Sequence, residues 1–196
     1  MSDIEGKSPA VTGEGRQPGD REPADIIARM LRVDHAGEYG AVRIYAGQLA
    51  VMKRRRRTRH KSQRAIATMA RQEEAHKATF DRLLVERRVR PTLLQPFWHV
   101  AGFALGAATA LLGEKAAMAC TVAVEDVIDR HYADQVAALG DEEKELRDTI
   151  AGFRADELHH RDEALKHGAE DTLGYPLLSA GVKAASRLAI WLSTRF

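Results

Sequence analysis

The sequence predicts an all-α protein, and three observations support this. No stretch of any length alternates apolar and polar residues as a half-buried strand would. From Pro23 onward alanine, leucine, arginine, glutamate and methionine dominate, and prolines fall at only a few places. We expect helices at about residues 25–52, 62–89, 97–113, 115–139, 142–168 and 176–194.

The boundaries between these helices follow from the prolines and from composition. Pro91, Pro96 and Pro176 mark helix ends because proline lacks the backbone N–H that a helix interior needs. Residues 1–24 are rich in glycine, proline, serine and acidic residues with almost no apolar pattern, so we expect them to be disordered. The folded domain is expected to span residues 25–196.

Length, cysteine content and charge restrict the class of protein. A chain of 196 residues can bury a core around a polar cofactor as one domain. Its single cysteine, Cys120, can form no internal disulfide, which favours a reducing compartment. The first 24 residues lack the apolar stretch of a secretory leader and are too acidic for a mitochondrial transit peptide, so a bacterial cytoplasmic origin fits best. A net charge of +2 gives no reason to expect a nucleic-acid partner.

An internal repeat carries the chemically informative residues. The string E-x6-Y-A-x-Q begins at Glu38 and again at Glu125. An E-x-x-H pair follows 35 residues after the first glutamate and 32 residues after the second. The candidate metal ligands are therefore Glu38, Glu73, His76, Glu125, Glu157 and His160.

Helical geometry turns this order into a site. Residues three apart lie on one face of a helix, so each E-x-x-H pair can offer two ligands to one point. Four neighbouring helices would then project four carboxylates and two imidazoles into one interior, which is the signature of ferritin-like di-iron and di-manganese bundles. The sequence therefore predicts a ferritin-like four-helix bundle with a dimetal centre.

The ligand types also indicate the metal. Four carboxylates and two neutral imidazoles balance the charge of two divalent cations. Mixed glutamate and histidine ligation suits iron or manganese, whereas structural zinc favours the cysteines that this chain lacks. We expect two iron ions per chain, held by these six residues.

Residues near the ligands are candidates for an outer shell. Asp34, His35 and His131 could accept or donate hydrogen bonds around the metal-bound imidazoles. Tyr45 and Tyr132 lie two turns beyond their glutamates, either as ordinary core aromatics or as hydrogen-bonding or electron-relay groups. Asp156 and His159 also have D-x-x-H spacing, but this pair is rotated by about 100° from the face of Glu157 and His160.

Three strings carry a family resemblance: RVDHAGEYGAVRIYAGQ, FALGAATALLGEKAAMACTVAVE and FRADELHHRDEAL. Together they closely resemble the 5-demethoxyubiquinone hydroxylase family of ubiquinone biosynthesis, over about residue 25 to the C-terminus. The resemblance implies a di-iron monooxygenase that uses O2 to hydroxylate the ring of a polyprenylated methoxy-benzoquinol. It also implies that Glu73 and Glu157 bridge the two irons, whereas each other ligand binds one.

The resemblance implies partners as well. The quinol substrate lies in a bilayer, so we expect peripheral binding to the cytoplasmic face of the bacterial cell membrane. No G-x-G-x-x-G fingerprint opens a helix, so the electrons are expected to come from an external donor. A homo-oligomer or a biosynthetic complex is compatible with the sequence.

Two helices are candidates for the membrane surface. Residues 97–113 are almost free of charge but too short to span a bilayer easily, and residues 176–194 form a basic amphipathic helix with Lys183 and Arg187 on one stripe. Core packing or oligomer contacts are the alternative for both. The arginine-rich connection at 53–61 is either a solvated link or a contact for anionic lipid headgroups, and lacks the interleaved aromatics of a nucleic-acid site.

Two other functions use parts of the same pattern. A metal-storage protein could oxidise iron at the same centre, although the apolar segments argue against a soluble storage cage. A membrane-bound scaffold for biosynthetic partners would not need six metal ligands. Metal content and quinone composition separate these possibilities.

Overall fold

The computed structural model describes residues 22–54 and 60–196, and these residues form helices and no strand. In chain order the helices are α1 (Pro23–Met52), α2 (His60–Glu86), α3 (Gln95–Leu112), α4 (Glu114–Ala138), α5 (Lys144–Lys166) and α6 (Tyr175–Ser193). Two short 3-10 helices, η1 (Asp141–Glu143) and η2 (Ala169–Asp171), precede α5 and α6. The all-α prediction is confirmed, and each helix boundary lies within three residues of its expected place.

Backbone geometry explains where the helices begin and end. Pro23, Pro96 and Pro176 occupy the first or second positions of α1, α3 and α6, where a missing N–H breaks no helical hydrogen bond. Helix α2 ends before the expected residue 89 because Arg88 has a φ of 54°, which a right-handed helix does not allow. Gly113 has a φ of 135° and lets the chain turn from α3 into α4.

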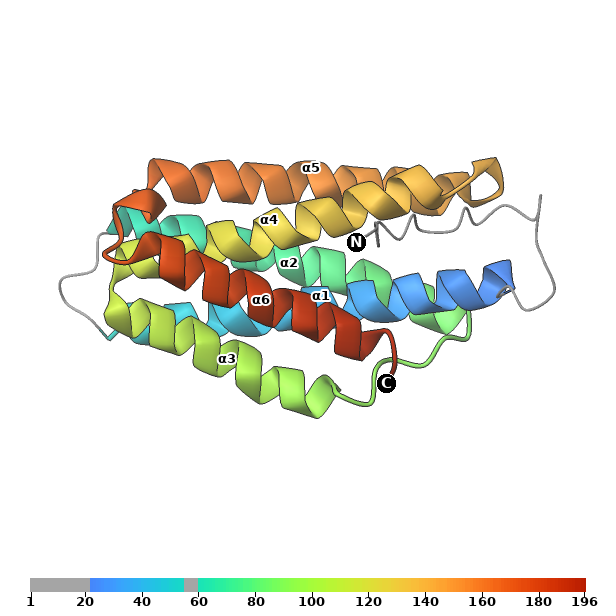
Figure 1. Ribbon diagram of the computed structural model, residues 1–196, viewed down its shortest axis with the longest axis horizontal. Helices are drawn as coiled ribbons and strands as arrows, with labels where there is room; N and C mark the ends of the chain where they lie inside the picture. The colour runs from blue at the N-terminus through green and yellow to red at the C-terminus, as the bar shows by residue number, and fades with distance from the viewer. Residues whose placement is uncertain (1–21, 55–59) are drawn as a thin grey trace, which may run out of the picture.

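Helices α1, α2, α4 and α5 form a four-helix bundle, and α3 and α6 lie on its outside (Figure 1). Successive helices run in opposite directions along the long axis of the molecule (Figure 1). Helix α3 packs along α1 and α6 packs along α4. The chain is therefore built from two similar three-helix units, α1 to α3 and α4 to α6, in agreement with the repeat in its sequence.

The contact between α3 and α1 depends on glycine. A Cβ atom on Gly106 would lie 1.9 Å from the carbonyl oxygen of Ile44, and one on Gly47 would lie 2.2 Å from the carbonyl oxygen of Phe103. Because the opposing atoms belong to the backbone, no side chain could rotate away to make room. Glycine at these two positions thus allows α3 to lie directly against α1.

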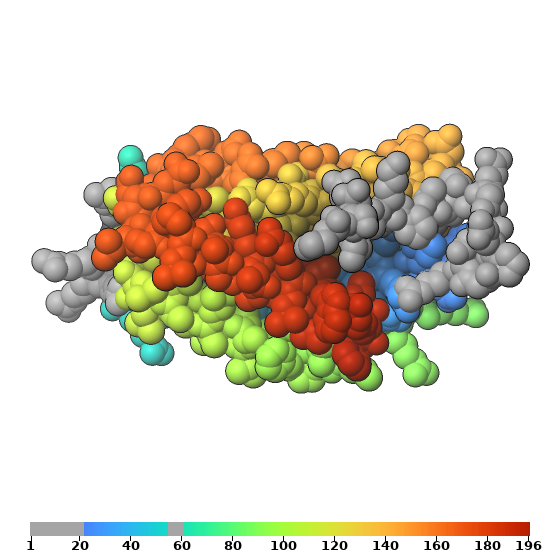
Figure 2. All heavy atoms as spheres, in the orientation of Figure 1, coloured from blue at the N-terminus to red at the C-terminus, as the bar shows by residue number. Residues whose placement is uncertain are grey.

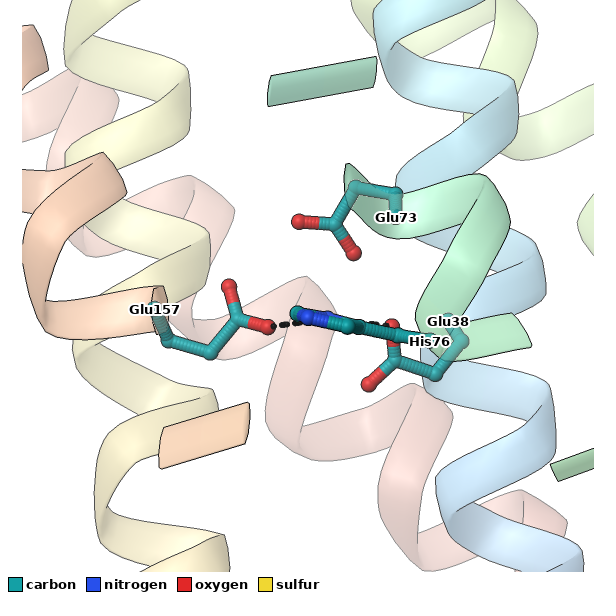
Figure 3. A group of neighbouring side chains, drawn as sticks. All are labelled: Glu38, Glu73, His76 and Glu157. Atoms are coloured by element: carbon teal, nitrogen blue, oxygen red, sulfur yellow. Dashed lines mark ion pairs between the residues drawn. The ribbon is translucent and has the colours of Figure 1, made fainter. Parts of the chain in front are cut away.

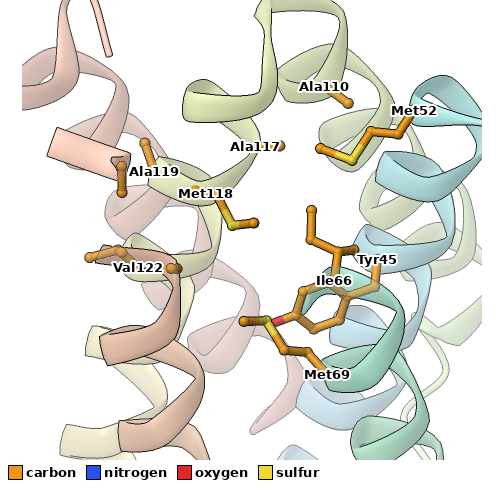
Figure 4. Close-up of a cluster of buried hydrophobic side chains, with 11 residues drawn as sticks. Tyr45, Met52, Ile66, Met69, Ala110, Ala117, Met118, Ala119 and Val122 are labelled. Carbon is orange, nitrogen blue, oxygen red and sulfur yellow. The ribbon is translucent and has the colours of Figure 1, made fainter. Parts of the chain in front are cut away.

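Two apolar clusters fill the ends of the bundle and leave its middle for polar groups. The first cluster contains Tyr45, Met52, Ile66, Met69 and Met118 (Figure 4). The second contains Ile27, Leu31, Phe80, Tyr132, Leu146 and Ile150. On α1, α2, α4 and α5 the buried glutamates and histidines lie between the residues of these clusters. Any chemistry at these groups therefore takes place inside the protein and away from both ends.

Two predicted segments lie mainly outside the described residues. These are the disordered N-terminal segment, 1–24, and the basic connection, 53–61, of which residues 1–21 and 55–59 are not described. Helix α1 already includes Pro23 and Ala24, so the folded part begins two residues earlier than expected. Among the described helices, none combines the length and apolar character that crossing a bilayer requires.

Candidate metal centre

The six predicted ligands meet in the middle of the bundle. They come from four helices: Glu38 from α1, Glu73 and His76 from α2, Glu125 from α4, and Glu157 and His160 from α5. None of these residues exposes more than 3% of its surface. Buried carboxylates at this density are costly unless cations or protons compensate them.

The six residues form two overlapping groups. Glu38, Glu73, His76 and Glu157 offer ligand atoms that all lie within 4.8 Å of one another, and their side chains point toward a common centre (Figure 3). Glu73, Glu125, Glu157 and His160 form a second group by the same measure. Glu73 and Glu157 belong to both groups, so they are the two carboxylates that two metal ions could share.

The imidazoles turn one nitrogen toward the carboxylates. His76 Nδ1 lies 3.2 Å from Glu157 Oε1 and 3.6 Å from Glu38 Oε2. His160 Nδ1 lies 3.0 Å from Glu73 Oε1 and 3.2 Å from Glu157 Oε2. Nδ1 is therefore the nitrogen of each histidine that could bind a metal ion.

The other nitrogen of each ring is held by a residue outside the ligand set. His76 Nε2 donates to Asp156 Oδ2 at 3.1 Å, and His160 Nε2 donates to Gln72 Oε1 at 3.1 Å. This assignment places the proton on Nε2, because both partners are acceptors, and leaves the lone pair on Nδ1. The outer contacts thus orient both rings for metal binding.

The electrostatics of the metal-free cluster are unfavourable for several carboxylates at once. Burial, followed by repulsion from Glu157, raises the pKa of Glu73 and that of Glu125 well above the ordinary value. Burial also raises the pKa of Glu38. Burial lowers the pKa of His76, but the nearby carboxylates of Glu157 and Glu38 outweigh it and raise that pKa to about 10. Without cations, the cluster therefore retains protons.

Unpaired polar atoms show that these residues fit a metal centre. The buried atoms Glu38 Oε2, Glu73 Oε1, His76 Nδ1 and Glu157 Oε1 have no hydrogen-bond partner among the described residues. Native proteins rarely leave several such atoms unpaired in one place. Oxygen and nitrogen donors without sulfur suit iron or manganese, so divalent cations would satisfy atoms that the protein itself leaves unpaired.

The tyrosine of each repeat forms a hydrogen bond with a glutamate of the other repeat. Tyr45 Oη, from the first repeat, donates to Glu125 Oε1 at 2.8 Å, and Tyr132 Oη, from the second, donates to Glu38 Oε1. Burial, followed by repulsion from the same glutamates, raises the pKa of both tyrosines well above the ordinary value, so both remain protonated donors. Each tyrosine therefore positions the glutamate that begins the other repeat. Of the alternatives left open for Tyr45 and Tyr132, the structure shows the hydrogen-bonding contact.

The predicted outer shell needs correction. Asp34 pairs with His131 at 2.9 Å, and His35 pairs with Asp81 at 2.8 Å, so none of the three candidates is hydrogen-bonded to a ligand imidazole. Asp156, which the helix angle had excluded, contacts His76 because α2 lies on that side of α5. Sequence reasoning also missed Gln72, although both residues immediately precede the glutamate of an E-x-x-H pair.

An apolar cavity of about 140 Å³ lies beside the ligand cluster, between α1, α3, α4 and α6. Gly37 and Val124 line it, and they are the neighbours of Glu38 and Glu125 in the chain. On its wall, Trp98 Nε1 donates to Ser193 Oγ at 3.1 Å and links α3 to α6. The cavity could therefore hold an apolar molecule within one helical turn of Glu38 and Glu125.

Comparison with known proteins places this arrangement in a family. Residues 25–193 match the family described as "Ubiquinone biosynthesis protein COQ7". The chain belongs to this family. The resemblance noted in the sequence is confirmed, and with it the expected membership of a family of ubiquinone biosynthesis hydroxylases.

Several curated members of the COQ7 family are similar along most of their length. The 3-demethoxyubiquinol 3-hydroxylase of Rhodospirillum rubrum is 58% identical over 184 residues, which cover 94% of this chain and 85% of the relative. The human mitochondrial NADPH-dependent 3-demethoxyubiquinone 3-hydroxylase is 49% identical, over 86% of this chain and 77% of the relative. The mitochondrial 5-demethoxyubiquinone hydroxylase of Saccharomyces cerevisiae is 41% identical, over 88% and 79%.

Proposed function

We propose that this protein is a di-iron monooxygenase that hydroxylates the ring of demethoxyubiquinol in ubiquinone biosynthesis. Its membership of the COQ7 family and the names of its relatives support the hydroxylase activity and the substrate. The proposal of two irons depends on one observation: Glu73 and Glu157 belong to both buried ligand groups. These two residues would hold both irons, Glu38 and His76 would complete the ligands of one iron, and Glu125 and His160 would complete those of the other.

Hydroxylation of the ring by O2 requires two electrons from an external reductant. One atom of O2 enters the new ring hydroxyl group, and the other leaves as water after two electrons and two protons are supplied. The iron pair, when bound, supplies the activation of O2. The names of eukaryotic relatives include NADPH dependence, and this chain has no dinucleotide-binding fingerprint, so we propose that its electrons come from an outside donor supplied by NADPH.

The protein's own residues bind and orient the quinol. The apolar cavity excludes water and places the ring beside the helical turns that carry Glu38 and Glu125. Tyr45 and Tyr132 hold the carboxylates of these glutamates in place from opposite ends of the cluster. Positioning of this kind is a large part of what an enzyme contributes when a cofactor carries the chemistry.

Quinone composition tests the function directly. A bacterial strain that lacks its hydroxylase should accumulate the demethoxylated quinone, and this protein should restore ubiquinone with one oxygen atom from labelled O2. Mass spectrometry of the extracted quinones measures both results. Label that enters from water would exclude the monooxygenase reaction, and an unchanged quinone profile would favour metal storage.

A substitution that fills the cavity tests where the quinol binds. Gly40 lines the cavity, and a Cβ atom added there meets no atom within 4 Å. Gly40→Leu should therefore lower kcat/KM for the quinol by about 10- to 100-fold, because the ring is displaced, while metal content stays unchanged. Gly152→Leu is the matched control, since Gly152 is an exposed residue of α5 that also has no neighbour within 4 Å of an added Cβ. Equal kinetics for the two variants would contradict this binding site.

We also propose that α3 and α6 bind the membrane surface. These helices lie on one face of the molecule (Figure 2). They expose large apolar side chains, which are Phe97, Val100, Leu111, Leu112, Leu177, Leu188 and Trp191. Since the cavity opens between the same two helices, a quinol could pass from lipid to the metal centre with little exposure to water.

One part of the expected basic stripe has another role. Lys183 Nζ lies 2.6 Å from Asp126 Oδ2 and joins α6 to α4, so it does not face the lipid. Arg187 is exposed, and the Arg195 guanidinium lies 3.7 Å from the centre of the Trp191 ring. These two arginines are the cations of α6 and its C-terminal end that can meet anionic headgroups.

Flotation with liposomes tests the membrane proposal. Leu188→Asp combined with Trp191→Asp should sharply reduce flotation with anionic liposomes, because both exposed side chains leave the acyl boundary. Iron content should remain unchanged, since neither residue lines the ligand cluster. The control is Val85→Asp, which alters an apolar residue that is 79% exposed on α2. Equal loss of flotation in the control would contradict a specific role of α6.

A further inference from the structure

The outer contacts of the two ligand histidines obey one rule. In each E-x-x-H pair, the residue before the glutamate bonds the histidine of the other pair: Gln72 contacts His160, and Asp156 contacts His76. The tyrosine contacts cross between the repeats in the same way. The two halves of the centre are thus related by the repeat down to their hydrogen bonds.

One position breaks this symmetry. His76 donates to a carboxylate, whereas His160 donates to a neutral amide oxygen. A carboxylate partner makes a metal-bound imidazole a stronger donor, because it stabilises the positive charge that develops on the ring. In other respects each half has one terminal glutamate, one histidine and one tyrosine that holds the glutamate. The charge of the outer partner is therefore the main difference in the contacts of the two imidazoles.

The surroundings of the half formed by Glu125 and His160 also favour weaker metal binding there. His160 and Gln72 line an open cavity of about 570 Å³ with mixed polar and apolar walls. Two cationic side chains, Lys61 and Arg64, and one carboxylate, Glu163, also line this cavity. On the other half, the ring of His76 stacks on Phe153 with 4.0 Å between ring centroids. Contact with this cavity offers the second half a path for metal exchange, whereas the neutral partner of His160 leaves its imidazole the weaker donor.

We propose that the half formed by Glu38 and His76 binds its metal ion more tightly than the half formed by Glu125 and His160, and that Asp156 and Gln72 set this order. The inference rests on the proposed dimetal centre. Asp156 and Gln72 act through the histidines and are positioning residues. The ion of the second half would exchange with solvent through the cavity that His160 and Gln72 line, so the centre would fill in sequence and pass through a state with one metal ion.

Titration of the full-length metal-free protein with Co²⁺ under anaerobic conditions tests the order. Calorimetry and the visible absorption of bound Co²⁺ should show two phases, with dissociation constants that differ by at least about tenfold. Glu38→Ala should remove the tight phase and Glu125→Ala the weak phase. Failure to bind two ions would count against the proposed centre itself, whereas two ions bound with equal affinity would overturn only this inference.

Isosteric variants then test the two positioning residues. Asp156→Asn should weaken the tight phase by about 10- to 100-fold, and Gln72→Glu should tighten the weak phase. The double variant Asp156→Asn with Gln72→Glu has an unchanged total charge but moves the carboxylate to the other half, so the order should reverse, and Glu38→Ala in this background should remove the weaker phase. An unchanged order in the double variant would overturn the inference. If Asp156→Asn does not fold, Gln72→Glu alone decides, since no tightening of the weak phase would have the same meaning.

Discussion

Glu73→Ala or Glu157→Ala should reduce bound iron from about two ions per chain to nearly none and abolish hydroxylation, because each residue belongs to both ligand groups. Removing a shared carboxylate takes one ligand from each metal site and one negative charge from the centre as a whole. It also frees the buried histidine nitrogens that face it, since His160 Nδ1 lies 3.0 Å from Glu73 Oε1. Iron content after anaerobic reconstitution, measured together with quinol turnover, checks the prediction.

Comparison variants separate bridging from general damage to the bundle. Glu74→Ala changes the exposed neighbour of Glu73 on the same helix and should leave iron content and turnover unchanged. Glu38→Ala and Glu125→Ala each affect one ligand group, so they should retain about one ion while turnover is lost. Full iron content in both the Glu73 and the Glu157 variant would contradict the ligand assignment.

The sequence was sufficient to predict the helices and to bring six distant residues into one site. This worked because the E-x-x-H spacing depends only on helical geometry, and because the repeat gives both halves the same order along the chain. The bridging pair was implied only by the family resemblance. In the structure, Glu73 and Glu157 are the two residues common to both ligand groups, which supports that role independently.

The outer shell could not be predicted because it depends on which helices are neighbours. The angle of about 100° between Asp156 and the ligand face is correct for α5 alone. It turns Asp156 away from its own pair but toward His76 on α2. Likewise, Tyr45 and Glu38 lie on one face of α1, yet Tyr45 bonds Glu125 on α4. Periodicity gives the direction of a side chain, whereas the partner that it meets comes from the packing of the bundle.

Removal of the metal ions should make the stability of the folded protein depend strongly on pH. Burial and repulsion raise the pKa of Glu73 and Glu125 well above the value of 4.5 that applies to an unfolded chain. Between that value and the raised pKa, the folded metal-free protein holds protons that the unfolded chain has released. The free energy of unfolding therefore falls as pH rises, with a slope of up to about 1.4 kcal/mol per pH unit for each retained proton.

The other shifted groups among the six predicted ligands leave this direction unchanged. His76, with its pKa raised to about 10, also holds a proton in the folded state that the unfolded chain loses above 6.5, so its contribution falls with rising pH as well. Burial raises the pKa of Glu157, but the adjacent imidazoles of His160 and His76 outweigh it and lower that pKa to about 2, which affects stability only as pH falls below 4.5. Between pH 5 and pH 9 these effects all have the same sign or are absent.

Bound cations should reverse this behaviour. Metal ions require deprotonated ligands, so binding becomes stronger as pH rises, and the added stability grows with metal affinity. Melting temperatures measured at pH 6 and pH 8 should fall with pH for chelator-treated protein and stay level or rise for protein loaded with Mn²⁺. Glu125→Gln should stabilise the metal-free protein at pH 8 and reduce its pH dependence, because one buried carboxylate is replaced by a neutral amide. If chelator-treated wild-type protein were instead more stable at pH 8 than at pH 6, the carboxylates would not be the groups that oppose folding, and the need for cations to compensate them would disappear.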